Sequence, residues 1–268
     1  MGYPGFSLVC LNTFGIPFFL SWSRLSRLAR QLEHLGPTII CLQEIQQNGY
    51  IPLLIRSLAN YPHHVLFPHV YAPKGGLGLF SRVPILTSRF DVYPDRGLRY
   101  LVTFSDWGLY KGVLITHLRI NGREIVVLNT HLNANYLGVW SLRNPLVRVQ
   151  RRQLSKLKTV VGDLTPDKVV VLCGDLNFPR GTFLYDELLA GTGLVDALAG
   201  NPKPTYRPFP LVPSQWKTSL DYMLCRVPDG AEFDIRADVL PIEDSGQKTS
   251  AGRFLTDHNA LTLRMRWT

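Results

Sequence analysis

The 268-residue sequence has only four cysteines, and none of them is in paired spacing. Cys10, Cys41, Cys173 and Cys225 each lie within an apolar, strand-like segment. A disulfide framework or a structural zinc site would need closely paired cysteines such as C-x-x-C. We therefore expect four reduced, buried thiols that pack as small apolar side chains in an intracellular protein.

The sequence also lacks a long apolar segment, since no stretch approaches the roughly 18 residues needed to span a bilayer. The first twenty residues are apolar, but they have no basic start, and Asn12, Gly15 and Pro17 interrupt them, unlike a signal peptide. We therefore expect a soluble, cytoplasmic protein that is at most peripheral to a membrane. No repeat, low-complexity tract or Gly/Ser linker divides the chain, which predicts a single domain over residues 1–268.

Acidic residues are outnumbered, with 20 Asp and Glu against 29 Lys and Arg, which gives a formal net charge of +9. This excess indicates an anionic partner. Nucleic acid, anionic lipid headgroups and phosphate esters all fit, and charge alone does not choose among them.

Short apolar segments bounded by Gly, Pro, Asn or Asp predict strands at residues 8–12, 38–44, 76–82, 112–118, 124–131, 169–175, 220–225 and 260–265. The Asn121–Gly122 pair between two of them predicts a β-hairpin. Leucines at helical spacing predict helices over residues 23–36 and 146–164, each with a cationic face that we interpret as solvated surface. Residues 201–217 are rich in proline and predict one long loop. Together these elements favour an α+β sandwich with sheets inside and helices outside.

Polar side chains occur at the ends of six predicted strands. A lone Asp-x-Asn after a strand is ordinary turn chemistry, but a recurrence at six strands is not expected by coincidence. Convergence of these groups at one rim would suit a hard divalent cation and a phosphate ester. The six sets are Asn12; Glu44; His131 with Asn133; Asp175 with Asn177; Asp221; and Asp257 with His258.

In this order the motifs resemble the endonuclease/exonuclease/phosphatase superfamily of metal-dependent phosphoesterases, from Asn12 to His258. The resemblance implies a four-layered α/β/β/α sandwich of two packed mixed sheets flanked by helices. It also implies Mg²⁺, or alternatively Mn²⁺, as the cofactor. Glu44 resembles the principal metal ligand, with Asn12 and Asp257 as further residues of the metal site.

The same resemblance implies roles for five catalytic residues. Asp175 and Asn177 resemble the pair that orients or deprotonates the attacking water and holds the phosphoryl oxygen. His131 and His258 resemble the histidines that stabilise the transition state and contact the scissile phosphate. Asp221 is expected to hydrogen-bond one imidazole, fixing its tautomer and keeping it cationic. Asp175 is the first choice for the general base, and His258 remains an alternative.

Other polar residues are interpreted as structural. His117 is expected in the core or on the surface, and His63, His64 and His69 on surface loops. Asn133 and Asn135 are equally consistent with loop residues and with an extension of the site. Tyr110 and Lys111 lie where the superfamily often has phosphate-facing groups, and a structural role is favoured for both.

The segment LNTFGIPFFLSWSRLSRLARQL resembles the neutral sphingomyelinase branch of the superfamily, as do GGLGLFSRVPI and YKGVLITHL. This resemblance implies a Mg²⁺-dependent phosphodiesterase that hydrolyses a phospholipid headgroup phosphodiester in the manner of phospholipase C. A metal-dependent DNA or RNA nuclease, or a phosphatase, is the alternative. The intact set of acids and histidines argues against a binding protein without activity.

Aromatic residues follow two of the site motifs: Phe18, Phe19 and Trp22 after Asn12, and Tyr136 and Trp140 after His131. Placed on rim loops, they would contact a membrane interface. Packing beneath the loops is the alternative, and stacking on nucleic-acid bases is a third.

Overall fold

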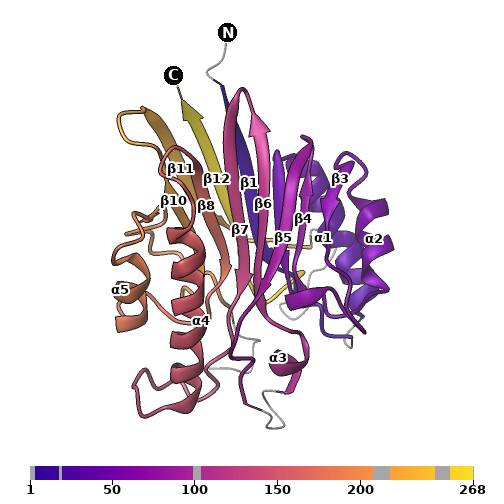
Figure 1. The fold of residues 1–268 in the computed structure, drawn as a ribbon. Coiled ribbons are helices and arrows are strands. Elements are labelled where there is room, and N and C mark those ends of the chain that lie inside the picture. Colours follow the sequence, from indigo (N-terminus) through magenta and orange to yellow (C-terminus); the bar gives the residue numbers. More distant parts are fainter. Residues whose placement is uncertain (1–3, 18–19, 99–103, 208–217, 245–253, 268) are drawn as a thin grey trace.

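In the computed structural model, two β-sheets pack face to face and helices cover their outer faces (Figure 1). α1 (Ser21–Leu35) and α2 (Tyr50–Ser57) lie on one side, and α4 (Pro145–Gly162) and α5 (Phe183–Leu189) lie on the other. The structure describes residues 4–17, 20–98, 104–207, 218–244 and 254–267. The predicted four-layered α/β/β/α sandwich is therefore confirmed.

The first sheet has the strand order β11-β12-β1-β2-β4-β3. Only β1 and β2 are parallel within it, and the other neighbouring pairs are antiparallel. β1 therefore lies at the centre, between the last strand of the chain and β2. The strands are β1 (Gly5–Asn12), β2 (Ile39–Gln43), β3 (His63–Val65), β4 (Gly78–Ser81), β11 (Phe233–Leu240) and β12 (Ala260–Trp267).

The second sheet has the order β5-β6-β7-β8-β10-β9, with β7 and β8 as its parallel pair. The predicted hairpin joins β6 to β7, and Asn121 and Gly122 have φ angles of 48° and 83°, as a two-residue hairpin turn requires. The strands are β5 (Ile85–Val92), β6 (Gly112–Ile120), β7 (Arg123–His131), β8 (Val169–Asp175), β9 (Val195–Asp196) and β10 (Asp221–Arg226).

Three apolar clusters fill the spaces between the four layers. The central one lies between the sheets, and an outer cluster lies under each helical layer. The predicted thiols are free and buried, with Cys10, Cys41 and Cys173 in the central cluster. Asn129 on β7 links the two sheets across this apolar layer, since it accepts from Gln43 Nε2 at 2.7 Å and donates to the carbonyls of Leu42 and Gly78. Both side chains are fully buried, so these bonds help to fix how the sheets lie over one another.

The observed strands differ from the predicted ones at two ends, and several short elements were not predicted. The predicted 38–44 strand ends at Gln43 because Glu44 has a φ of 57°. The predicted 76–82 strand begins at Gly78 because η1 (Lys74–Gly76) forms a 3₁₀ turn there. β3, β5, β9, β11, α2, α5 and the short α3 (Phe104–Gly108) were not predicted, because they are short or only half-buried and carry weak apolar patterns.

Part of the expected Pro-rich loop lies outside the described residues, since the structure describes 201–207 and resumes at 218. Phe18 and Phe19 also lie outside them. Among the described residues, no helix is both long and apolar enough to cross a bilayer.

Candidate active site

The sheet topology brings the predicted site residues to one edge of the sandwich. Asn12, His131 and Asp175 are the last residues of β1, β7 and β8, and Glu44 directly follows β2. β10 and β12 run antiparallel to β8 and β1, so their amino ends reach the same edge. Asp221 begins β10 directly opposite Asp175, and His258 lies two residues before β12.

Asn12 joins the two sheets at this edge. Its Nδ2 group donates to Glu44 Oε1 and to Asp175 Oδ2, each at 3.0 Å, while its Oδ1 accepts from the backbone N–H of Phe14. The side chain is fully buried, and these three hydrogen bonds pair both of its polar atoms. Asn12 therefore holds the two acids at a set separation and does not simply cap a turn.

Glu44 is held in an unusual backbone conformation. Its positive φ turns the chain out of β2, and the hydroxyl of Thr13 donates to the Glu44 carbonyl at 3.2 Å. A Cβ on Gly15 would come within 2.0 Å of that carbonyl, so only glycine permits this close approach. The Glu44 side chain remains 17% exposed, and burial together with the negative charge of Asp257 raises its pKa.

Asp175 and Asn177 form a tight turn after β8. The backbone N–H of Asn177 donates to Asp175 Oδ1 at 2.9 Å, and Asn177 has a φ of 55°. The Asn177 amide donates to the carbonyl of Leu132, which ties this turn to the end of β7. Burial and the neighbouring charge of Asp221 raise the pKa of Asp175 to about 7. Asp175 is thus a carboxyl group that gains or loses a proton near neutral pH.

Asp221 and His258 form a buried pair. His258 Nδ1 lies 2.8 Å from Asp221 Oδ2, and its Nε2 lies 3.7 Å from Asp175 Oδ2. Burial alone would lower the pKa of His258, but Asp221, Asp175 and Asp257 raise it well above its usual value. The pair therefore presents a cationic imidazole with Nε2 directed at Asp175.

His131, unlike His258, has surroundings that favour the neutral imidazole. Its Nε2 lies 3.7 Å from Asp175 Oδ2 and 4.0 Å from Glu44 Oε1. Burial and the positive charges of Lys111 and His258 lower its pKa well below the usual value. His131 is therefore neutral near pH 7, and these contacts are not ion pairs. Lys111 itself is fully buried and is occupied by the Leu132 carbonyl and by Asp106.

The donor set fits a divalent cation. Ligand atoms of Glu44, His131 and Asp175 lie within 4.8 Å of one another, and so do those of Asp175, Asp221 and His258. Glu44 in the first set is the better candidate ligand, because it stays partly exposed, whereas Asp221 and His258 already satisfy each other. Burial, together with the neighbouring charges of Asp257 and Asp221, raises the pKa values of Glu44 and Asp175, and a bound cation would favour their ionised forms.

Asp257, the third residue predicted at the metal site, is in neither of these sets. Burial raises the pKa of its carboxyl group, and its backbone carbonyl accepts from the N–H of Arg207 at 2.7 Å. Its charge acts on Glu44 and His258. Its direct role toward a metal remains a prediction.

Two supporting residues were not identified from sequence. Tyr206 places its ring 5.1 Å from the imidazole of His258, with burial and Asp257 raising the pKa of its hydroxyl to about 12. Arg24 donates to the carbonyls of Thr13 and Leu255 and also reaches Phe14, so it joins the β1 loop to the segment before His258. Tyr206 lies in a loop without regular pattern, and Arg24 lies on a helix face expected to be solvated, so neither gave a signal.

The other predicted histidines lie outside the site. His117 on β6 contacts Glu124 at 2.8 Å. The surface-loop prediction was wrong for His63 and His64, which lie on the short strand β3, and His69 is a partly exposed loop residue. Asn133 is structural, since its N–H and its Oδ1 both bond to the Gln153 side chain. Asn135 stays in the loop after β7.

A sequence profile of the Endonuclease/Exonuclease/phosphatase family matches residues 12–258 of this chain. A putative neutral sphingomyelinase of Drosophila melanogaster is 24% identical over 195 residues, which is 71% of this chain and 43% of the relative. An inositol phosphosphingolipids phospholipase C of Saccharomyces cerevisiae is 28% identical over 164 residues, which is 59% of this chain and 33% of the relative. The chain thus spans less than half of each of these two relatives.

Solved structures share the fold at low sequence identity. Sphingomyelinase C from Streptomyces griseocarneus has a TM-score of 0.70 at 20% identity, over 97% of this chain and 99% of that chain. A magnesium-bound beta toxin variant from Staphylococcus aureus has a TM-score of 0.72 at 16% identity, over 97% and 99%. TDP2 of D. rerio, complexed with a single-strand DNA product, has a TM-score of 0.73 at 17% identity, over 98% and 99%.

The profile match covers every residue of the predicted site, from Asn12 to His258. The chain belongs to the Endonuclease/Exonuclease/phosphatase family.

Proposed function

We propose that this chain is a metal-dependent phosphodiesterase that hydrolyses a phospholipid headgroup phosphodiester by in-line attack of water, in the manner of phospholipase C. The observation that carries the proposal is the convergence of Glu44, Asp175, His131 and the Asp221–His258 pair at one edge of the two sheets. Burial and the nearby charges of Asp257 and Asp221 disfavour the ionised forms of Glu44 and Asp175, which is typical of groups placed for function.

Mg²⁺, with Mn²⁺ as an alternative, is the proposed cofactor, and it would polarise the phosphodiester and neutralise its charge. Glu44 would be its principal protein ligand, since that carboxylate keeps 17% of its surface exposed. Asn12 would act by holding Glu44 and Asp175 together, and Asp257 by adding negative charge beside them.

Asp175 is proposed as the general base that takes a proton from the attacking water. Its Oδ1 is occupied by the Asn177 N–H, which fixes the carboxylate plane, and its Oδ2 faces both imidazoles at 3.7 Å. A pKa near working pH is what an efficient general base needs. Asn177 would position this carboxylate and hold the phosphoryl oxygen.

His258 is proposed to donate from Nε2 to a phosphoryl oxygen as negative charge develops there. Its contact with Asp221 favours the cationic form, which suits a donor better than a base. His131 is neutral, and its Nε2 would donate a second hydrogen bond to the phosphoryl group. These assignments favour Asp175 over His258 as the base.

A phospholipid is the favoured substrate because the relatives named above include a putative neutral sphingomyelinase and an inositol phosphosphingolipids phospholipase C. Exposed apolar side chains near the site, Leu20, Trp22, Tyr136 and Leu137, also suit a lipid interface. The protein would act peripherally at a membrane surface that faces the cytoplasm, where its four buried free thiols stay reduced.

Cleavage of nucleic acid is the second candidate, and one observation favours it specifically. TDP2 of D. rerio, which shares the fold over nearly the whole chain, is seen with a single-strand DNA product. The net charge of +9 also suits a phosphate backbone.

A substrate panel separates these candidates. Sphingomyelin, lysophosphatidylcholine, an inositol phosphosphingolipid, single- and double-stranded DNA, RNA and inositol phosphates would each be incubated in EDTA and in excess Mg²⁺ or Mn²⁺. We expect metal-dependent release of a phosphorylated headgroup from a lipid. Hydrolysis of nucleic acid without lipid hydrolysis would replace the substrate assignment, and no turnover of any phosphodiester would refute the proposed activity.

A further inference from the structure

The loop between β7 and α4, residues 132–144, presents apolar side chains to solvent. Leu137, Val139 and Leu142 are 63%, 56% and 49% exposed. Tyr136 is exposed at 47%, whereas Trp140 is half-buried and packs against the cluster beneath α4. The sequence favoured neither aromatic over the other, and the structure shows that aliphatic side chains dominate the outer surface of this loop.

This loop is ordered by its own hydrogen bonds. The Asn144 amide donates to Asn135 Oδ1 at 2.9 Å and to the Val139 carbonyl at 2.8 Å. Asn135 also donates to Val139 and accepts from the N–H of Leu137. Gly138, with a φ of 64°, makes the turn between the two exposed aliphatic residues. The loop therefore holds its apolar side chains outward, where water opposes them.

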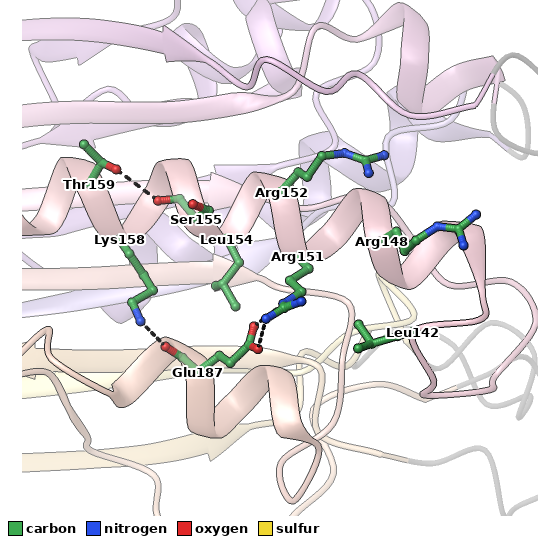
Figure 2. Close-up of a pocket in the computed structure, with 9 residues that line it drawn as sticks. All are labelled: Leu142, Arg148, Arg151, Arg152, Leu154, Ser155, Lys158, Thr159 and Glu187. Carbon is green, nitrogen blue, oxygen red and sulfur yellow. Dashed lines mark hydrogen bonds and ion pairs between the residues drawn. The ribbon is translucent and has the colours of Figure 1, made fainter.

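A positively charged surface continues from this loop along α4. Residues 132–162 contain six cations and no acid, and the first acid after them is Asp163. Figure 2 shows part of this surface as a groove of about 930 Å³ between α4 and α5, with Leu142 and Arg148 at one end. Arg151 and Lys158 contact Glu187 across the groove, and Arg152 pairs with Asp95, so these three cations already have partners. The six cations are Arg143, Arg148, Arg151, Arg152, Lys156 and Lys158.

The loop lies beside the active site. It begins directly after His131, and the carbonyl of Leu132 accepts from both Lys111 and Asn177. α4 then starts at Pro145, capped by Asn144, so Arg143 and Arg148 lie at the end of the helix nearest the loop. In Figure 1 the segment before α4 is at the lower end of the molecule, where β7 and β8 end.

We infer that residues 136–143 together with Arg148, the β7–α4 surface, dock on a bilayer that contains anionic lipid. Leu137, Val139 and Leu142 would enter the interface, while Arg143 and Arg148 would contact headgroup phosphates. Aliphatic side chains favour a bilayer over nucleic acid, because they cannot stack on bases. The inference rests on the proposed action on a membrane lipid and adds which surface of the chain meets the membrane.

The test measures vesicle co-sedimentation of the full chain and four variants. Vesicles would be pure phosphatidylcholine, or phosphatidylcholine with 30 mol% phosphatidylserine. The variants are Leu137→Ser/Val139→Ser, Arg143→Gln/Arg148→Gln, and two controls. One control is Val195→Ser, which changes an exposed aliphatic residue on β9. The other is Arg119→Gln/Arg266→Gln, which changes two exposed cations near the ends of β6 and β12 that lie away from the active site.

We expect the serine variant to bind both vesicle types at least about tenfold more weakly, because it loses buried apolar area. The arginine variant should lose roughly 30-fold on anionic vesicles, about fivefold for each cation near the surface, and little on neutral vesicles. Both controls should bind as the unchanged chain does. Equal binding by all variants, or no vesicle binding by the unchanged chain, would overturn the inference.

Hydrolysis of soluble bis(p-nitrophenyl) phosphate, measured in parallel, separates this inference from the proposed activity. Variants that keep this hydrolysis but lose vesicle binding support the docking surface. Vesicle binding through the loop without lipid hydrolysis would keep the surface and reject the lipid substrate. Binding to a DNA duplex would be measured as well. If the arginine variant binds DNA more weakly while every variant binds vesicles as the unchanged chain does, the cations serve nucleic acid and the inference is overturned.

Discussion

The Asp221–His258 pair gives the most direct test of the proposed site, through Asp221→Asn. The carboxylate is 2% exposed and lies 2.8 Å from His258 Nδ1. An amide of the same size can still accept the Nδ1–H but carries no charge. The imidazole then loses the neighbour that favours its cationic form, and its Nε2 is unprotonated near neutral pH.

The magnitude follows from the distance. At 2.8 Å and an effective dielectric constant of about 20, two opposite charges attract by about 6 kcal/mol. Desolvation of the two buried groups costs several kcal/mol and offsets much of this attraction. The loss of one charged donor to the phosphoryl group should therefore lower kcat by roughly 10²- to 10³-fold, as for other lost donors to developing charge. KM should change little, since bound substrate carries less charge than the transition state.

The assay is kcat against pH from 5 to 9, with Mg²⁺ present. Asp221, Asp175 and Asp257 raise the pKa of His258, so activity that needs the imidazolium should be lost only as pH rises above the usual histidine range. In Asp221→Asn this alkaline limb should move to lower pH. Asp238→Asn, an exposed carboxylate bonded to Lys203, is the matched control and should leave the profile unchanged. A kcat within threefold of the unchanged chain at every pH would refute the role assigned to the pair.

Three further changes test other parts of the site and fold. Glu44→Gln should weaken Mg²⁺ binding by at least about tenfold in calorimetry and lower turnover with it, whereas exposed Glu232→Gln should do neither. Asp175→Ala should lower kcat by at least roughly 10²-fold, and near-normal turnover would remove it as the base. Gly174→Ala should destabilise the fold by about 3 kcal/mol or more in urea unfolding, because its Cβ would lie 1.8 Å from a backbone oxygen of β7 at a φ of 143°. Gly162→Ala, where the added Cβ meets nothing within 4 Å, is its control and should be neutral or slightly stabilising.

The elements that could be predicted from sequence are those that are fully buried or whose backbone angles select few residue types. β8 is buried along its whole length, so its apolar run gave the correct bounds. The hairpin turn at Asn121 was equally clear, because two successive positive φ angles select few residue types. β11 was missed because alternate side chains are exposed, and its charged residues weaken the apolar signal.

The convergence of strand-end residues could be anticipated from their recurrence, but their individual contacts could not. Nothing in the sequence indicates that Asn12 and Asp175, 163 residues apart, hydrogen-bond to each other. The ring of Tyr206 against His258 depends on the path of an irregular loop. Lys111 lies where the superfamily often has phosphate-facing groups, yet its amine is occupied by the Leu132 carbonyl and by Asp106.

The charges of the site also oppose one another within the fold. Glu44, Asp175 and Asp257 all have raised pKa values, chiefly because burial disfavours their ionised forms. These acids lie at one edge of the two sheets, and Asn12 donates a hydrogen bond to each of Glu44 and Asp175. Metal-free protein must therefore hold negative charge that the unfolded chain would leave in water, and a bound cation would relieve this cost.

This cost predicts how stability without metal depends on pH. A carboxyl group whose pKa is raised on folding stabilises the fold below its unfolded pKa of about 3.9 and loses that contribution as pH rises through the folded value. With Asp175 at about 7, its ionisation alone should lower the free energy of unfolding in EDTA by about 1.4 kcal/mol between pH 6 and pH 8. The raised pKa of His258 lowers stability further over this interval, whereas His131, with its lowered pKa, opposes the trend mainly below pH 6.5. Urea unfolding at both pH values measures the fall, and Asp175→Asn should reduce it. Saturating Mg²⁺ should also reduce it, since a cation keeps the carboxylate ionised. Stability in EDTA that rises over this interval would show that Asp175 ionises freely and does not share the crowded charge we assign to the site.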